Sequence, residues 1–269
     1  MPRKSEQLAL VAPIDTTMDT PATAVFSDQR TVHTAAPTLP DALQPNTRQR
    51  MDGLDFLSLL PPSTIPVAFL DPQYRGVLEK LAYGNEGKDR GKRRCALEQM
   101  NESMIGQFVR GIDRALIPSG HLFLWVDKFH LCQGVRPWFD GTSLDIVDLV
   151  TWDKCTLGMG YRTRRRAEYC VVLQKQPRKA KGVWKVHNIP DVISEDVPED
   201  VEEDFPEVCP ERVSRREHPH AKPVELQAKL LAAVSHEGDY VIDPAAGSYS
   251  VLEAARLRGR NFLGCDLNG

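Results

Sequence analysis

Short apolar runs alternate with segments of helical periodicity from about Arg48 to the end of the chain. The apolar runs cover residues 65–70, 121–126, 144–152, 168–174, 240–242 and 261–265. Runs of this length, bounded by turn residues, are typical of buried strands. The helical segments cover residues 54–60, 97–116, 223–234 and 249–258. Because strands that alternate with helices pack as a parallel sheet with helices on both faces, the pattern predicts a doubly wound α/β fold.

The chain divides into an arm and a domain. Residues 1–46 are rich in Thr, Ala, Pro and Asp and show no periodicity, which predicts a flexible N-terminal arm. Residues 47–269 have the length of one large α/β domain. Within this domain, residues 175–217 include a strongly acidic stretch with several prolines, which favours a surface linker over a core element.

Composition argues against several classes of protein. No apolar run approaches the roughly 20 residues that a membrane-spanning helix needs. The N-terminus lacks the apolar segment of a secretory signal. The six cysteines are scattered without a CxxC pair, which argues against a zinc site and a disulfide framework. We therefore expect a cytoplasmic protein with reduced thiols, no membrane partner and no metal.

The formal net charge of -3 conceals an uneven distribution. Without the acidic stretch the chain is net positive, with basic clusters at residues 88–94, 162–166 and 175–185. Such clusters bind phosphate groups through charge and do not read bases. For residues 162–166, a solvated face that pairs with the acidic stretch is the alternative. The candidate phosphate contacts are Lys88, Arg93, Arg162, Arg164 and Arg165.

The first candidate site, Asp71-Pro72-Gln73-Tyr74, directly follows the apolar run at residues 65–70. In open α/β sheets, ligands bind beyond the carboxyl ends of the strands. The Asp71 carboxylate can accept a hydrogen bond from an amine, and Pro72 favours a rigid turn that presents carbonyl oxygens. Tyr74 offers an aromatic face on which a base can stack. These residues are together suited to hold an amino group.

The second candidate site, Asp243-Pro244-Ala245-Ala246-Gly247-Ser248, joins the strand at residues 240–242 to a helix. Gly247 allows the backbone to approach a ligand closely. The start of the helix offers unpaired amide groups and a partial positive charge. Asp266 ends the next strand, at a place where an acidic residue can bind ribose hydroxyls.

The order and spacing of these motifs resemble those of the beta-class amino-group DNA methyltransferases. The catalytic motif of that family, Asp/Ser/Asn-Pro-Pro-Tyr/Phe/Trp, agrees with residues 71–74 at three of four positions. Its cofactor motif, Asp-Pro-Phe-x-Gly-Ser-Gly, is similar to residues 243–249, and its His-Pro-x-x-Lys-Pro-x-x-Leu segment is similar to residues 218–226. Residues 152–168 resemble the segment that helps to form the target-base pocket, and Met51-Asp52-Gly53 resembles the family's Gly-Asp segment.

The resemblance implies a Rossmann-like methyltransferase sheet with circularly permuted motif order. It also implies that the enzyme uses S-adenosylmethionine as its cofactor. It implies that Asp71, Pro72, Gln73 and Tyr74 hold the exocyclic amine of a base flipped out of double-stranded DNA, with adenine favoured because Asp71 leads the motif. Residues 175–217 correspond to a reduced recognition region. The implied cofactor residues are Asp243, Pro244, Ala245, Gly247, Ser248, Asp266 and Lys222.

Two departures from the family pattern leave alternatives open. Gln73 replaces the second proline of the catalytic motif, and Tyr249 replaces the last glycine of the cofactor motif. A cytosine N4-amine methyltransferase would use the same residues, and a DNA-binding subunit that has lost activity would tolerate both replacements. The acidic stretch is a solvated linker or a lid that mimics DNA. An RNA substrate, a homodimer and a role in restriction–modification also stay open.

Overall fold

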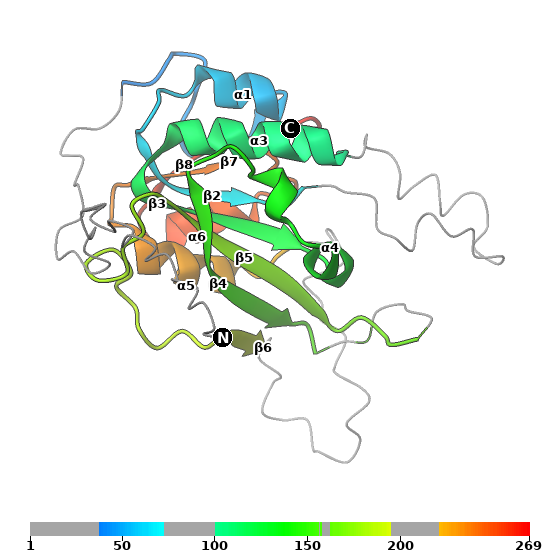
Figure 1. Cartoon of the computed structure of the whole chain (residues 1–269). Helices are drawn as coiled ribbons and strands as arrows, with labels where there is room; N and C mark the ends of the chain where they lie inside the picture. The colour runs from blue at the N-terminus through cyan, green and yellow to red at the C-terminus, as the bar shows by residue number, and fades with distance from the viewer. Residues whose placement is uncertain (1–37, 73–99, 156, 158–161, 195–220) are drawn as a thin grey trace, which may run out of the picture.

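The computed structural model describes residues 38–72, 100–155, 157, 162–194 and 221–269. Within these residues, an eight-stranded sheet with the order β1-β8-β7-β2-β3-β5-β4-β6 forms the centre of the fold (Figure 1). None of the described helices is long and apolar enough to cross a membrane. The strands are β1 (Gln49–Arg50), β2 (Ile65–Leu70), β3 (Leu116–Val126), β4 (Leu144–Asp153), β5 (Ala167–Lys175), β6 (Val192–Ser194), β7 (Tyr240–Asp243) and β8 (Asn261–Asp266).

Helices cover both faces of the sheet (Figure 1). One face carries α1 (Gly53–Leu59) and α3 (Glu102–Ala115), and the other carries α5 (Val224–Val234) and α6 (Ser250–Leu257). The short helix α4 (Lys128–Gln133) and the 3₁₀ helix η2 (Arg136–Trp138) connect β3 to β4. Each of α1, α3 and α4 begins at a residue whose side chain accepts hydrogen bonds from first-turn amides, namely Asp52, Asn101 and Asp127.

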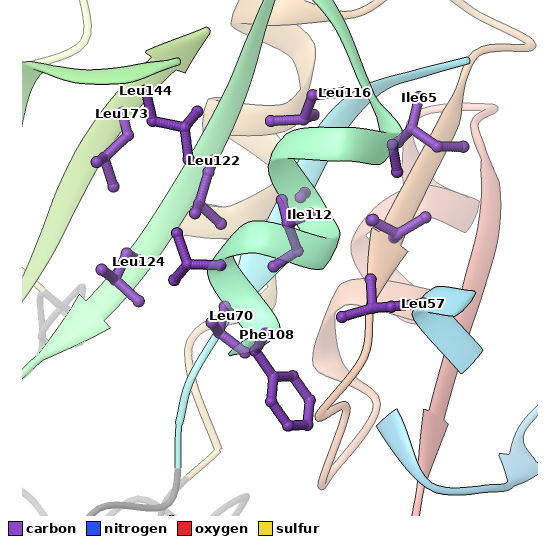
Figure 2. Close-up of a cluster of buried hydrophobic side chains, with 14 of the residues drawn as sticks. Leu57, Ile65, Leu70, Phe108, Ile112, Leu116, Leu122, Leu124, Leu144 and Leu173 are labelled. Carbon is purple, nitrogen blue, oxygen red and sulfur yellow. The ribbon is translucent and has the colours of Figure 1, made fainter. Parts of the chain in front are cut away.

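Two apolar cores hold the helices to the sheet. Figure 2 shows the first core, in which Phe108 and Ile112 of α3 lie against leucines of the central strands. The second core fills the opposite face, where Leu230 of α5, Leu252 of α6 and Phe69 of β2 belong to one buried cluster. Successive residues of β2 enter alternate cores, so both faces of this strand are buried. That double burial explains why the sequence of β2 is continuously apolar.

The sheet is mixed, which corrects the expectation of a parallel sheet. Strand β5 runs antiparallel to both β3 and β4. The reason lies in the connection between β4 and β5, which contains no helix in its described part and returns the chain directly to the neighbouring position. A parallel neighbour needs a crossover, usually a helix. The remaining neighbours, from β1 across to β3, are parallel as expected.

The structure also moves one element boundary and adds elements that periodicity did not predict. Strand β3 begins at Leu116, because that residue already pairs with Ile65, so residues 117–120, between the predicted helix and the predicted strand, lie inside β3 at an irregularity of its register. The elements β1, α4 and β6 were not expected. Leu43, from the segment expected to be a flexible arm, is buried in the first core. Residues 195–217 of the expected linker lie outside the described residues.

Tyr249, at the position of the family's last motif glycine, has a left-handed backbone with φ 60° and ψ 30°. This conformation costs about 1–2 kcal/mol for a residue with a Cβ, which is why glycine suits the position. The Tyr249 side chain is only 1% exposed, and its hydroxyl donates to the Gln49 carbonyl at 2.9 Å. Its ring packs edge-on against Phe262. The tyrosine therefore ties the start of α6 to β1 and β8.

We expect Tyr249→Gly, which restores the family residue, to destabilise the protein. Glycine relieves the left-handed strain but removes a buried aromatic ring, whose loss costs about 3–5 kcal/mol. Tyr249→Phe keeps the ring and loses one hydrogen bond, at a cost of about 0.5–1.5 kcal/mol. Urea unfolding of both variants measures the difference. A Tyr249→Gly protein at least as stable as the wild type would contradict this account.

Candidate active site

The carboxyl ends of β2 and β7 form a topological switch point. The two strands are parallel neighbours, with Ala68 opposite Ile242. The chain leaves β2 toward β3 over the face that carries α3, and leaves β7 toward β8 over the face that carries α6 (Figure 1). Ligands of open α/β sheets bind where successive connections diverge in this way. Both predicted motifs are at this edge, because Asp71 directly follows β2 and Asp243 ends β7.

Three carboxylates from adjacent strands gather at the switch point. Asp266 ends β8, which pairs with β7 so that Asp243 is opposite Gly264. Asp243 is 4% exposed, and the Ala245 amide donates to its Oδ1 at 3.1 Å. Burial, together with the negative charges of Asp71 and Asp266, raises the pKa of Asp243 to about 7. This buried carboxyl is therefore only partly ionised near neutral pH.

Lys222 brings a positive charge into this group of carboxylates. Its ammonium forms an ion pair with Asp71 and a second one with Glu168 Oε2 at 3.2 Å. The ring of Trp125 lies 5.3 Å from the same ammonium. Although burial disfavours the charged form, Asp71 and Glu168 raise the pKa of Lys222 above its ordinary value. Lys222, which the sequence suggested for the cofactor side, thus directly contacts the predicted catalytic carboxylate.

The loop after β7 has a backbone suited to a close ligand. Gly247 has a φ of +48° and is exposed, and the Ala246 amide donates to the Cys265 carbonyl at 2.9 Å. The Pro244 carbonyl lies against Gly53, where an added Cβ would collide with it. Ser248 and Ala245 are half-buried. The Met51-Asp52-Gly53 segment therefore packs on the cofactor motif from the neighbouring helix α1.

The donors and acceptors of this loop fit S-adenosylmethionine. That cofactor carries positive charge on its sulfonium and amino groups, and two hydroxyls on its ribose. Asp243 and Asp266 offer carboxylates for such groups. Gly247 lets the chain approach without a side chain, and α6 begins directly beyond the loop. The binding of the cofactor by Asp243, Pro244, Ala245, Gly247, Ser248 and Asp266 stays a prediction, with which the chemistry of this loop is compatible.

The basic residues 162–166 lead into β5 at the same edge of the sheet. Arg162 is exposed, and Arg164 donates to the Leu157 carbonyl at 3.2 Å. The guanidinium of Arg165 lies 5.6 Å from the ring centroid of Phe129, which belongs to α4. Its Nε and Nη2 are buried and have no hydrogen-bond partner among the described residues. Arg165 therefore retains donor groups for a further acceptor.

Four predicted site residues, Gln73, Tyr74, Lys88 and Arg93, lie outside the described residues, so their roles stay predictions.

Two residues that sequence reasoning did not single out as site residues extend the contacts of Lys222. Glu168 bridges Lys222 to Lys154, whose ammonium is 3.0 Å from Glu168 Oε1. Although burial opposes it, the charges of Lys222 and Lys154 lower the pKa of Glu168 to about 2. The signal in the sequence was weak, since only strand pairing brings Lys154 near Glu168.

Comparison with known proteins identifies the family. Residues 87–269 match the profile of a family described as DNA methylase, which includes N6 and N4 enzymes. The chain is 51% identical over 223 residues to the Type II methyltransferase M.HhaII of Haemophilus parahaemolyticus, with 82% of this chain and 91% of the relative covered. The chain belongs to the N6/N4 DNA methylase family. It is accordingly a DNA methyltransferase that uses S-adenosylmethionine and has DNA as its substrate.

Solved structures of methyltransferases share the fold. The complex of M1.HpyAVI with S-adenosylmethionine matches with a TM-score of 0.54 at 15% identity, covering 81% of this chain and 91% of that one. The cytosine-N4-specific PvuII DNA methyltransferase matches with a TM-score of 0.56 at 13% identity, covering 82% and 81%. The expectation of a Rossmann-like methyltransferase sheet with permuted motif order is confirmed.

We expect Asp243→Asn to stabilise the cofactor-free N6/N4 methylase in a pH-dependent way. The pKa of Asp243 is raised above its ordinary value near 4, so its contribution to stability is complete below pH 4 and is lost as pH rises through about 7. Asparagine avoids that loss and keeps the acceptor for the Ala245 amide. The thermal midpoint of the variant should therefore exceed that of the wild type at pH 8 and equal it near pH 4.

The control for this comparison is Asp140→Asn, because the Asp140 side chain is 65% exposed. Its midpoint should differ from that of the wild type by the same small amount at both pH values. If the difference in thermal midpoint between Asp243→Asn and the wild type does not change with pH, then burial and neighbouring charges do not raise the pKa of Asp243 as described above.

Proposed function

We propose that this DNA methyltransferase transfers a methyl group to the N6 amine of an adenine flipped out of double-stranded DNA. One observation carries the proposal: Asp71 lies at the switch point beside Asp243, so the predicted amine-binding and cofactor-binding motifs share one edge of the sheet. An enzyme that moves a methyl group between two bound molecules needs this juxtaposition. The N6 amine of adenine has two hydrogens that a carboxylate and a carbonyl can accept.

In the proposed mechanism, the chain positions the amine. The Asp71 carboxylate and the Pro72 carbonyl accept its two hydrogens and draw the nitrogen toward tetrahedral geometry. Tyr74 stacks on the flipped base. Bound S-adenosylmethionine supplies an electrophilic methyl group. Positioning of this kind can provide about 7–11 kcal/mol of the rate enhancement. The proton that the nitrogen loses passes along Asp71 to solvent, because the Asp71 side chain is 38% exposed.

The basic segments are proposed to contact the DNA backbone. Arg165 has two buried donor groups without a partner, and Arg162 and Arg164 are exposed next to it. A phosphate oxygen is an acceptor that would use these donors. We propose the same role for Lys88 and Arg93 on the strength of their charge and their place shortly after the catalytic motif. These contacts would set affinity and leave base reading to other residues.

A cytosine N4 amine is the second candidate target, because the fold is shared with the cytosine-N4-specific PvuII enzyme. Asp71 at the first motif position favours adenine, as the resemblance implies. The similarity to a Type II methyltransferase supports a role in restriction–modification, in which methylation protects the host's own DNA. We place that activity in the bacterial cytoplasm.

Asp71→Ala should abolish methyl transfer and leave cofactor affinity within a few-fold of the wild type. The substitution removes the amine acceptor, whereas Asp243, Asp266 and the Gly247 backbone remain. Transfer of labelled methyl to unmethylated DNA and calorimetric titration with S-adenosylmethionine measure the two effects, with Asp140→Ala as control. Nucleoside mass spectrometry of the wild-type product should show N6-methyladenine. N4-methylcytosine instead would reject the adenine assignment, and a fully active Asp71→Ala enzyme would reject the mechanism.

Arg165→Gln should weaken DNA binding and reduce its dependence on salt. The plot of log K against log salt concentration has a negative slope, and each lost phosphate contact reduces the magnitude of that slope by about 0.9. Arg256→Gln is a matched control, because Arg256 is an exposed arginine of α6 that lies in none of the three basic clusters. Fluorescence anisotropy at several salt concentrations gives both slopes. Equal slopes for Arg165→Gln and the wild type would show that Arg165 contacts no phosphate.

A further inference from the structure

Lys222 is a buried cation held between two carboxylates from distant parts of the chain. Its side chain is 9% exposed, and it precedes α5 on the face of the sheet opposite to α3. Asp71 follows β2, and Glu168 belongs to β5, on the far side of β3. The Lys222 ammonium therefore bridges two strands that do not pair with each other. This bridge passes beside Trp125, whose ring lies 5.3 Å from the ammonium.

The bridge continues into a row of alternating charges. Lys154, at the end of β4, pairs with the other oxygen of Glu168 at 3.0 Å. The row thus runs from Asp71 to Lys222, Glu168 and Lys154, with each charge next to its opposite. Within the described part of the chain, Lys222 provides the only ion pair of Asp71. Glu168 and Lys154 in turn fix the position of the lysine.

The geometry at Asp71 suits a carboxylate that must present one oxygen to a ligand. Lys222 donates to Oδ2, and among the described residues no donor contacts Oδ1, so the ion pair leaves this oxygen as an acceptor at a defined orientation. Asp71 also acts electrostatically on the buried carboxyl of Asp243, which ends the neighbouring strand β7 and interacts with Asp266 as well. Without Lys222, the negative charge of Asp71 would act on Asp243 with no opposite charge from this lysine, which disfavours the ionised form of Asp243. A buried ion pair adds little to stability compared with an apolar replacement, so stability alone does not explain this row.

We propose that Lys222 is a positioning residue that balances the negative charge of Asp71 and orients its carboxylate toward the target amine, with Glu168 and Lys154 fixing Lys222 in place. The inference rests on the proposed catalytic role of Asp71. It differs from the role on the cofactor side that the sequence resemblance suggested for Lys222. A lysine that positions Asp71 should affect kcat and leave cofactor affinity unchanged. A lysine that binds the cofactor should affect cofactor affinity and leave kcat at saturation unchanged.

The first test compares Lys222→Met with Lys222→Arg in the full-length enzyme. At saturating DNA and S-adenosylmethionine, we expect kcat to fall about 100-fold or more in Lys222→Met, the usual scale for losing one electrostatic contact at an active site. Lys222→Arg keeps the charge, so its kcat should be at least about tenfold higher than that of Lys222→Met. Calorimetry should show cofactor affinity within about threefold of the wild type in both variants.

Lys229→Met is the matched control, because Lys229 is an exposed lysine of α5. Its kcat and its cofactor affinity should equal those of the wild type. An unchanged kcat in Lys222→Met would overturn the proposal. A large loss of cofactor affinity with wild-type kcat at saturation would also overturn it and would place Lys222 in the cofactor site.

The dependence of kcat on pH gives a readout that a purely structural role would not change. In Lys222→Met, kcat should rise more steeply between pH 6 and pH 9 than in the wild type, because Lys222 lowers the pKa of Asp243 and its loss leaves that neighbour of Asp71 protonated to higher pH. A parallel pair of profiles would contradict a role in ionisation. Within the described residues, the titratable groups that interact with Lys222 or Asp71 are Glu168, Cys170 and Asp243, whereas Lys154 interacts with Glu168 and Asp266 with Asp243.

Glu168→Gln tests the same row if Lys222→Met does not fold. The variant should lower kcat by a smaller factor and leave cofactor affinity unchanged, because Lys222 keeps Asp71 but loses its second partner. A wild-type kcat in Glu168→Gln would then overturn the proposal. Failure of the adenine assignment is a separate outcome, since mass spectrometry of the wild-type product reveals the target base. The variants are scored against whichever amine the wild type methylates.

Discussion

The switch point at the carboxyl ends of β2 and β7 depends on the parallel pairing of these two strands. These strands are far apart in the sequence, and their register places Ala68 opposite Ile242. Since Asp71 and Asp243 follow within a few residues, this register alone sets how the catalytic and cofactor motifs face each other. A shift of one residue would turn every side chain of a strand to the opposite face. The two cores exclude such a shift, because alternate residues of β2 are buried in different cores.

The cofactor loop shows how one fold accommodates a change at a sensitive position. Glycine at position 249 would adopt the left-handed backbone without strain. Tyrosine adopts it at a cost, but its ring fills the space beside Phe262 and its hydroxyl satisfies the carbonyl of Gln49. The departure from the family motif is thus compensated within the loop's own surroundings. It gives no reason to regard the site as inactive.

The sequence predicted the elements whose burial shows directly as a continuous apolar run or as helical periodicity. Both faces of β2 are buried, so it reads as a continuous apolar run, and the helices α5 and α6 agree with the predicted segments within one residue at each end. The direction of β5 could not be predicted, because strand periodicity contains no information on strand direction. Nor could the row of charges, since Lys222, Glu168 and Asp71 meet only through the order of strands in the sheet.

The site must handle opposite charges at one edge of the sheet. Its cofactor is cationic at the sulfonium, whereas its DNA substrate is a polyanion. Carboxylates dominate the switch point, with Asp243 and Asp266 on the cofactor side of Asp71. The arginines of residues 162–166 lie farther along the same edge, where the chain enters β5. Lys222 stands between these regions and compensates one carboxylate in each direction, toward Asp71 and toward Glu168. In the proposed mechanism, this single buried ammonium allows the carboxylates proposed to bind the cofactor and the carboxylate proposed to bind the amine to lie side by side.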